Sequence, residues 1–157
     1  MTVKPKRDGY HSVTPYLIVR GATRAIEFYK QAFGAVERFR MPGPGGRVGH
    51  AELTIGDSCV MLADEVPEMG FVGPEAVGGT PVTFMIYVED VDERFTSALA
   101  AGANEIQPVE DKFWGDRAGL LRDPFGHLWT LATHVEDVPP DEIERRAAKV
   151  MQEHCES

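Results

Sequence analysis

The sequence predicts an α+β fold built from two copies of one module, each a strand, a helix and then a group of strands. Residues 47–64 align without a gap with residues 117–134, at a constant offset of 70 residues. Upstream, residues 14–19 align with residues 83–88, and both runs are rich in the β-branched and aromatic side chains typical of strands. A repeat of this length that occurs only twice indicates a duplicated half-domain rather than a solenoid.

A helix is predicted directly after the first strand of each copy. In residues 23–33, the apolar side chains of Ile26, Tyr29 and Phe33 recur at the spacing that places them on one helix face. Residues 91–101 have the same place in the second copy. A glycine follows each segment, as expected for a residue that ends a helix in the left-handed conformation.

These patterns give the expected organisation of a single domain over residues 1–157. Its parts are module one at about 11–65, a linker at about 66–80, module two at about 81–135 and a C-terminal helix at about 141–153. The linker is rich in Gly and Pro and could instead form a loop over a pocket. The apolar spacing of Ile143, Ala147 and Val150 suggests that the C-terminal helix docks on the body or on a second subunit.

Composition excludes several classes of partner. The formal net charge of −9 opposes binding to a phosphate backbone, so we expect no nucleic-acid partner. No apolar run approaches the roughly 20 residues of a membrane helix, and residues 1–8 resemble a frayed terminus rather than a secretory signal. Cys59 and Cys155 lie far apart and form no CxxC motif, which favours a reducing, cytoplasmic location without a disulfide.

Three segments resemble a known family. They are VTPYLIVRGATRAIEFYKQAFGA, GHAELTIGDSCVMLAD and FWGDRAGLLRDPFGHLWTLATHVEDV. Together with the repeated order they resemble the vicinal oxygen chelate superfamily (glyoxalase/bleomycin-resistance/dioxygenase type), and its PhnB-like branch in particular. The resemblance covers about residues 13–138. It implies two βαβββ modules that form a curved, cupped mixed sheet with helices outside, and a homodimer in which paired subunits often complete the ligand site.

The resemblance also implies where a metal would bind. Metal-dependent relatives take four His, Gln or Glu ligands from the first and last strands of the two modules. The corresponding residues in this chain are Thr14, Thr83, Thr130 and, depending on the register, Val60 or Met61. A borderline divalent cation prefers imidazole or carboxylate ligands, and none of these positions supplies one. We therefore expect no metal cofactor, although a divalent metal held by other residues stays open.

The alternation of side chains along strands predicts what lines the cup instead. If Thr14 faces the cup, every second residue of its strand does too, and the repeat extends this pattern to the second copy. His50 and Glu52 lie on the polar face of their strand, and the offset of 70 places Arg122 at the position equivalent to Glu52. The predicted lining is Thr14, Tyr16, His50, Glu52, Thr83, Met85, Tyr87, Arg122 and Thr130.

Within this lining, His50 and Glu52 are the candidate catalytic residues. Two residues apart on one strand face, they could perform acid–base chemistry or hold a metal with help from elsewhere. Alternatively, Glu52 pairs with Arg122 and only orders the sheet. The structural interpretation is favoured because two ligands on one strand do not complete a coordination sphere.

The segment 113–117 adds two aromatic residues to the candidate site. Phe113 and Trp114 lie beside a glycine turn and could line a pocket by stacking on a planar or cationic group. Asp116 and Arg117 could form a local ion pair that fixes the turn. Residues 123–126 (DPFG) are interpreted simply as a turn.

Two classes of function follow. The first is a binding protein that sequesters or binds an aromatic or cationic small molecule without the usual metal. The alternative is a metal-dependent or acid–base lyase, epimerase or dioxygenase that uses His50 and Glu52. Relatives in the PhnB-like branch are often labelled demethylubiquinone methyltransferases, but nothing in this sequence resembles a cosubstrate loop for methyl transfer.

Overall fold

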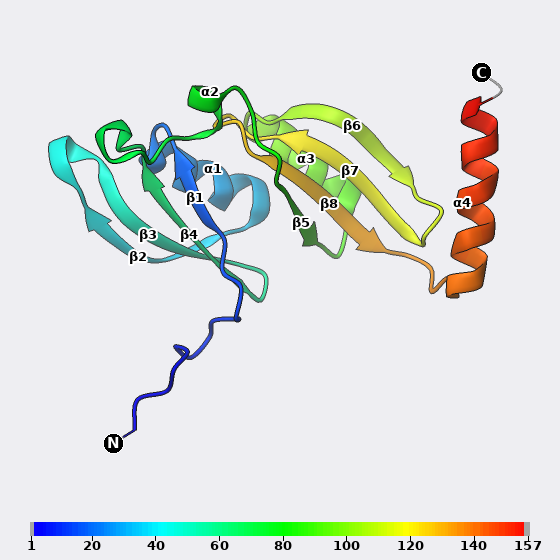
Figure 1. Cartoon of the computed structure of the whole chain (residues 1–157), viewed down its shortest axis with the longest axis horizontal. Coiled ribbons are helices and arrows are strands. Elements are labelled where there is room, and N and C mark those ends of the chain that lie inside the picture. The colour runs from blue at the N-terminus through cyan, green and yellow to red at the C-terminus, as the bar shows by residue number, and fades with distance from the viewer. Residues whose placement is uncertain (1, 156–157) are drawn as a thin grey trace.

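The computed structural model describes residues 2–155 and has two modules with the same order of elements. Module one contains β1 (Tyr16–Val19), α1 (Ala22–Phe33), β2 (Val36–Pro42), β3 (Val48–Ile55) and β4 (Ser58–Asp64). Module two contains β5 (Thr83–Tyr87), α3 (Val91–Ala101), β6 (Asn104–Asp111), β7 (Asp116–Arg122) and β8 (Leu128–His134). Figure 1 shows the modules side by side along the longest axis.

Each module folds into a four-stranded mixed sheet of identical topology. The strand orders are β1-β4-β3-β2 and β5-β8-β7-β6, and the first strand pairs in parallel with the last in both. In register, Tyr16 lies opposite Met61, and Met85 lies opposite Thr130. The predicted α+β fold of two repeated modules is therefore confirmed.

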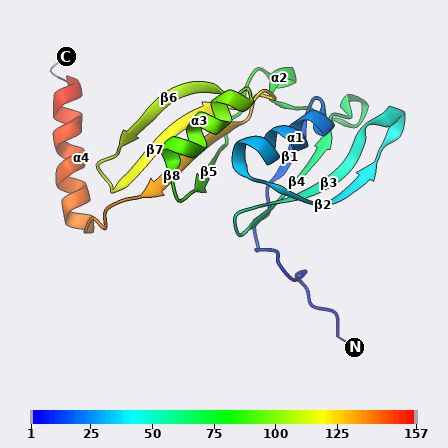
Figure 2. The same cartoon turned by 180° about the vertical axis from the view of Figure 1, so that it is seen from behind.

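The two helices cover the same face of their sheets, as Figure 2 shows from behind. On α1 the predicted stripe of Ile26, Tyr29 and Phe33 is buried, and Gly34 ends the helix with φ 66°. A side chain at Gly34 would be strained in this left-handed conformation, which glycine adopts freely. The opposite face of each sheet carries half-exposed side chains, among them Tyr16 on the first sheet and Met85 on the second.

A buried carboxylate joins the two modules. Asp123 accepts hydrogen bonds from the hydroxyl of Tyr29 at 2.6 Å and from the indole nitrogen of Trp129 at 2.9 Å. It also accepts from the backbone N–H groups of Phe125 and His127. Tyr29 belongs to module one and the other residues to module two. The interpretation of residues 123–126 as only a turn was therefore incomplete.

The predicted first strand is shorter in the structure. β1 begins at Tyr16, so Thr14 precedes the strand rather than lying in it. The connection between the modules holds a 3-10 turn, η2 (Pro67–Met69), and a single-turn helix, α2 (Pro74–Val77). A further 3-10 turn, η1 (Pro44–Gly46), forms the glycine-rich connection between β2 and β3.

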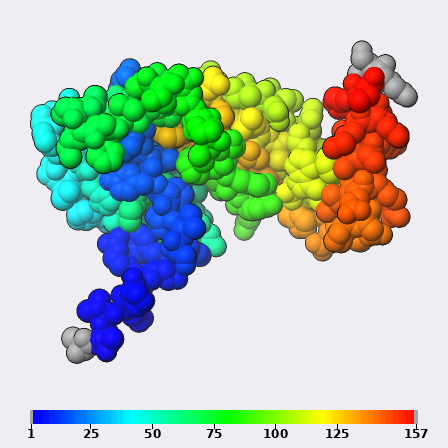
Figure 3. Space-filling view, viewed as in Figure 1, coloured from blue at the N-terminus to red at the C-terminus, as the bar shows by residue number. Residues whose placement is uncertain are grey.

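Helix α4 (Pro140–Cys155) stands at one end of the molecule, beyond module two, as the space-filling view shows (Figure 3). It has no buried residue, although Ile143, Ala147 and Val150 are partly covered. Arg146 joins the helix to the body, pairing with Glu136 and donating to the carbonyl of Phe113. Among the described residues, no helix has the length and apolar character needed to cross a membrane.

Candidate functional site

The open face of the second sheet carries a pocket of about 470 Å³, named here the β5–β8 pocket. Its walls combine aromatic, thioether and polar side chains from β5, β6, β7, β8 and the β6–β7 turn. The lining residues are Thr83, Met85, Tyr87, Gln107, Lys112, Trp114, Asp116, Ala118, Gly119, Leu120 and Thr130. Five predicted site residues therefore meet here, namely Thr83, Met85, Tyr87, Trp114 and Thr130.

One buried carboxylate organises the aromatic side of this pocket. Asp116 is only 3% exposed, and its Oδ2 accepts hydrogen bonds from the hydroxyl of Tyr87 at 3.0 Å and the indole nitrogen of Trp114 at 3.1 Å. The Tyr87 and Trp114 rings are thereby held by one anchor. The predicted ion pair of Asp116 with Arg117 does not form, because Asp116 turns inward and Arg117 instead binds Asp92 and Asp111.

The other oxygen of Asp116 is bound by a histidine. Nδ1 of His134 lies 2.9 Å from Oδ1 of Asp116, and its Nε2 lies 2.8 Å from Asp137. Hydrogen bonds to Asp137 and Asp116 raise the pKa of His134 above its ordinary value. Burial alone would raise the pKa of Asp116, but bonds from His134, Tyr87 and Trp114 outweigh it and lower that pKa. The carboxylate is therefore held in its charged form.

The open face of the first sheet carries a polar cluster formed by Tyr16, His50 and Glu52. Nε2 of His50 lies 3.1 Å from Oε1 of Glu52, and Nδ1 lies 2.8 Å from the Tyr16 hydroxyl. Both ring nitrogens of His50 are therefore occupied, one by Glu52 and the other by the Tyr16 hydroxyl. The predicted alternation on β3 is confirmed, since Ala51 and Leu53 are buried on the other face.

Glu52 is covered by the segment that precedes β1. The guanidinium of Arg7 lies 2.7 Å from Oε1 of Glu52, and the Tyr10 hydroxyl donates to Oε2. Burial would raise the pKa of Glu52, but hydrogen bonds from Tyr10, Arg7 and His50 outweigh it and lower that pKa to about 2. A carboxylate bound in this way is a poor general base at neutral pH, which weakens the acid–base hypothesis.

Three predicted site residues lie elsewhere. Arg122 does not pair with Glu52, whose cation is Arg7, and instead lines a separate pocket beside Pro74 and Gly78. The repeat offset correctly places Arg122 on β7, at the position equivalent to Glu52 on β3. It does not indicate that β3 and β7 belong to two separate sheets. Phe113 packs edge-on against Trp114 without lining the β5–β8 pocket.

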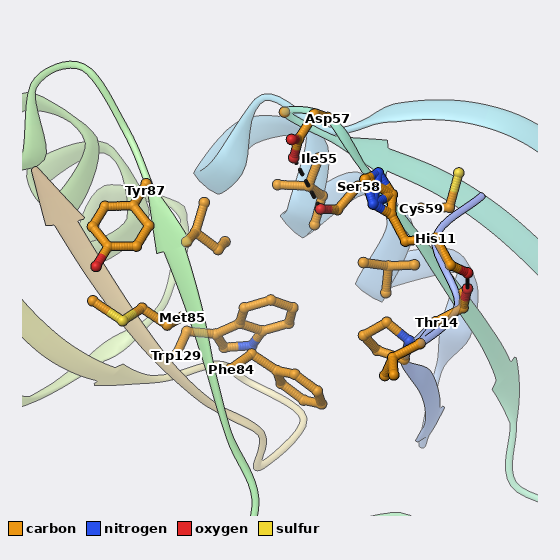
Figure 4. Close-up of a pocket in the computed structure, with 15 residues that line it drawn as sticks. His11, Thr14, Ile55, Asp57, Ser58, Cys59, Phe84, Met85, Tyr87 and Trp129 are labelled. Carbon is orange, nitrogen blue, oxygen red and sulfur yellow. Dashed lines mark hydrogen bonds between the residues drawn. The ribbon is translucent and has the colours of Figure 1, made fainter. Parts of the chain in front are cut away.

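Thr14 lies at a cavity of about 590 Å³ between the modules (Figure 4). One wall is formed by β5 with Trp129, and the other by the β3–β4 turn with the segment ahead of β1. Tyr87 also borders this cavity, but its hydroxyl points away from the opposite wall, toward Asp116. The polar groups bond locally, Ser58 to Asp57 and Thr14 to the carbonyl of His11, so no set of them converges on a ligand.

The donor set does not fit the divalent metal that the fold family often holds. No group of three His, Cys, Asp or Glu residues with metal-binding geometry occurs within residues 2–155. The aligned positions present threonine hydroxyls and the side chain of Val60 or Met61, and His50 is committed to Tyr16 and Glu52. We therefore derive no chemistry through a metal at these positions.

The sequence patterns did not identify several residues of these two sites, or their partners, for three reasons. Gln107 lies on β6, and Lys112 directly follows that strand. The pairing of β6 with β7 is irregular, so strict alternation of side chains along the strand does not predict the face on which these residues lie. Arg7 and Tyr10 precede the repeat and have no equivalent residue in the second module. The partners Tyr87 and His134 of Asp116 come from other strands, which a local pattern around Asp116 does not indicate.

Comparisons with known proteins agree with the fold. Residues 9–131 match the model of the Glyoxalase/Bleomycin resistance protein/Dioxygenase superfamily. An uncharacterized protein of Mycobacterium bovis is 48% identical over 136 residues, covering 85% of this chain and 90% of the relative. The crystal structure of TioX from Micromonospora sp. ML1 is 33% identical with a TM-score of 0.63, covering 80% of this chain and 99% of that chain.

A solved Bacillus cereus structure, described as a putative 3-demethylubiquinone-9 3-methyltransferase, PhnB protein, is 20% identical with a TM-score of 0.62. It covers 78% of this chain and 99% of that chain, and at this identity it supports the fold alone. The family match and the mycobacterial relative establish more: the chain belongs to the Glyoxalase/Bleomycin resistance protein/Dioxygenase superfamily.

Proposed function

We propose that this chain binds a planar aromatic small molecule, neutral or cationic, in the β5–β8 pocket without a catalytic metal. The observation that carries the proposal is the shared anchor of Tyr87 and Trp114 on Asp116. Two aromatic side chains fixed by one buried carboxylate stay in place before a ligand arrives, so less conformational entropy is lost on binding.

The composition of the pocket supports this ligand class. Met85 adds a polarizable thioether that favours aromatic contacts, and Gln107 and Thr130 offer hydrogen bonds that would orient a heteroatom. A volume of about 470 Å³ lies within the usual range for small-molecule sites. The net charge of −9 favours a cationic ring over an anionic one, and the pocket's own cation, Lys112, pairs with Glu110.

The assignment to the PhnB-like branch is also a proposal, supported by the three resembling segments. We further propose a homodimer, because large apolar side chains are open to solvent on both sheet faces: Tyr16, Phe39 and Met41 on the first, Met85, Tyr87 and Trp114 on the second. Light scattering after gel filtration should give twice the chain mass. The two free cysteines, Cys59 and Cys155, support a cytoplasmic location.

The binding proposal can be tested through the two tryptophans of the chain. In a ¹H–¹⁵N spectrum, the indole signal of Trp114 reports on the β5–β8 pocket, and that of buried Trp129 reports on the core. Quinoline and N-methylquinolinium, a matched neutral and cationic pair, should shift the Trp114 signal and leave the Trp129 signal in place. Cyclohexylammonium, which is cationic but not planar, should shift neither. Equal shifts of both indoles, or no shift with either ring, would contradict the proposal.

A further inference from the structure

The segment ahead of β1 passes beside the first sheet, and the side chains of Arg7 and Tyr10 reach a buried carboxylate on that sheet. Arg7 lies 2.7 Å from Glu52, whose side chain is 9% exposed, whereas the Arg7 side chain is 61% exposed. The guanidinium carbon of Arg7 also lies 4.2 Å from the centre of the Tyr10 ring. Arg7 is therefore held between a carboxylate and an aromatic face.

The rest of the segment has its own anchors on the sheet. The thiol of Cys59 donates to the carbonyl of Gly9, and Arg38 lies against both Cys59 and the Tyr10 ring. Tyr10 itself donates to the second oxygen of Glu52. If the Arg7 side chain swings out, these anchors keep Tyr10 in place, and a space remains between Oε1 of Glu52, Nε2 of His50 and the Tyr10 ring.

The negative charge of Glu52 makes it unfavourable to leave the position of the Arg7 guanidinium without a cation. Within residues 2–155, the side chains that pair with Glu52 are the permanently charged guanidinium of Arg7 and the imidazole of His50. The exposed Arg7 guanidinium can be hydrated when it leaves, but the Glu52 carboxylate is only 9% exposed and loses a charged donor that water replaces poorly. The departure of Arg7 is therefore favoured when another cation takes its place.

We propose that the Glu52 site is a binding site for a small-molecule guanidinium, and that Arg7 occupies it as an internal, displaceable ligand. The site lies on a different sheet from the β5–β8 pocket and is independent of the function proposed for that pocket. The chain's own side chain identifies the ligand chemistry.

The geometry favours a guanidinium over an ammonium. A guanidinium is planar, donates along its edge to a carboxylate and stacks with its face on an aromatic ring. Arg7 makes both contacts, to Glu52 and to Tyr10. A compact, strongly hydrated ammonium can make the first contact but stacks less well.

The test uses the full chain, with methylguanidinium as the probe and methylammonium as its matched control. Binding is followed through the imidazole signals of His50, which lies 3.1 Å from Glu52. A tethered side chain competes at an effective concentration of millimolar order, so with a site affinity of about 0.1 mM for a guanidinium, Arg7→Ala should bind methylguanidinium about tenfold more tightly than the unaltered chain. Arg7→Lys, which keeps the charge, should lie between the two. Methylammonium should bind Arg7→Ala more weakly than methylguanidinium does.

Two further variants make the result decisive. Lys4→Ala removes a cation from the same segment that pairs with Asp8 instead, and it should behave like the unaltered chain. Adding Glu52→Gln to Arg7→Ala should abolish the tighter binding. The proposal is overturned if Arg7→Ala and the unaltered chain bind the probe equally, or if the response survives Glu52→Gln. Because the readout is His50, failure here leaves the Trp114 test of the β5–β8 pocket unaffected.

Discussion

Tyr87 and Trp114 hydrogen-bond to the same oxygen atom, Oδ2 of Asp116, although they come from β5 and from the turn between β6 and β7. The carboxylate therefore connects two parts of the pocket wall that are not neighbours in the sheet. Asp116 is itself part of the pocket lining and fixes the two rings beside it.

Asp116→Ala should loosen both rings together. Hydrogen bonds to a charged acceptor contribute about 1.5–3 kcal/mol each, but Tyr87, Trp114 and His134 can all partly rebond to water, so we expect a loss of about 1–3 kcal/mol in the free energy of unfolding. Quinoline binding should weaken in parallel. Asp111→Ala is the matched control, because this exposed carboxylate pairs with Arg117 away from the rings. Urea unfolding of both variants checks the prediction, and equal effects would contradict it.

Tyr29→Phe should weaken the link between the modules. The variant removes a buried hydrogen bond of 2.6 Å to Asp123 without changing the ring. We expect a loss of about 1.5–3 kcal/mol in the free energy of unfolding, because the acceptor is a carboxylate. Tyr16→Phe removes a hydroxyl from the half-exposed partner of His50 and should cost less. If denaturant curves show the two variants to be equally stable, Asp123 is not the link inferred here.

The pH dependence of stability should reveal Glu52. Its pKa is lowered from 4.5 to about 2 in the folded chain, because the bonds from Tyr10, Arg7 and His50 outweigh the effect of burial. A lowered folded pKa contributes stability that is present above pH 4.5 and is lost as the pH falls toward 2. The stability gap between the unaltered chain and Glu52→Gln should therefore narrow as the pH falls from about 5 toward 2. A gap that stays constant or widens would be inconsistent with the hydrogen bonds from Tyr10, Arg7 and His50 to Glu52. The same measurement on Glu105→Gln, at an exposed position, controls for the general effect of acid.

His134 should titrate above its ordinary range. Asp137 and Asp116 bind its two ring nitrogens and raise its pKa above 6.5, so its contribution to stability is present below 6.5 and fades as the pH rises through the higher folded value. Asp137→Asn removes the charge of the larger contributor and should bring the pKa of His134 down. An NMR titration of the imidazole signals measures this directly, and an unchanged pKa in the variant would show that the Asp137 contact is absent in solution.

The sequence predicted the fold well because the signals for it are local or repeated. The stripe of Ile26, Tyr29 and Phe33 and the alternation around Glu52 each follow from the geometry of one element. The repeat gave the equivalence of the modules. These patterns correctly assigned Tyr87 and Met85 to the open face of their sheet.

The partners of the site residues could not be predicted in the same way. Glu52 was expected to pair with Arg122 through the pseudo-symmetry, but its cation comes from a segment outside the repeat. The hydrogen bond between Tyr29 and Asp123 joins residues 94 positions apart, and no local pattern indicates it. Alternation gives the face on which a side chain lies but not which other element packs there.

The most direct test of the central claim is a calorimetric titration of N-methylquinolinium into the untagged protein, first in EDTA and then with Zn²⁺, Ni²⁺, Fe²⁺ or Mn²⁺ added. Metal-independent binding in the β5–β8 pocket predicts the same affinity in every condition, lost in a variant that combines Tyr87→Ala with Trp114→Ala. Binding that requires a metal, or tight stoichiometric metal binding abolished by His50→Ala or Glu52→Ala, would contradict the account and make the metal-dependent enzyme the leading hypothesis.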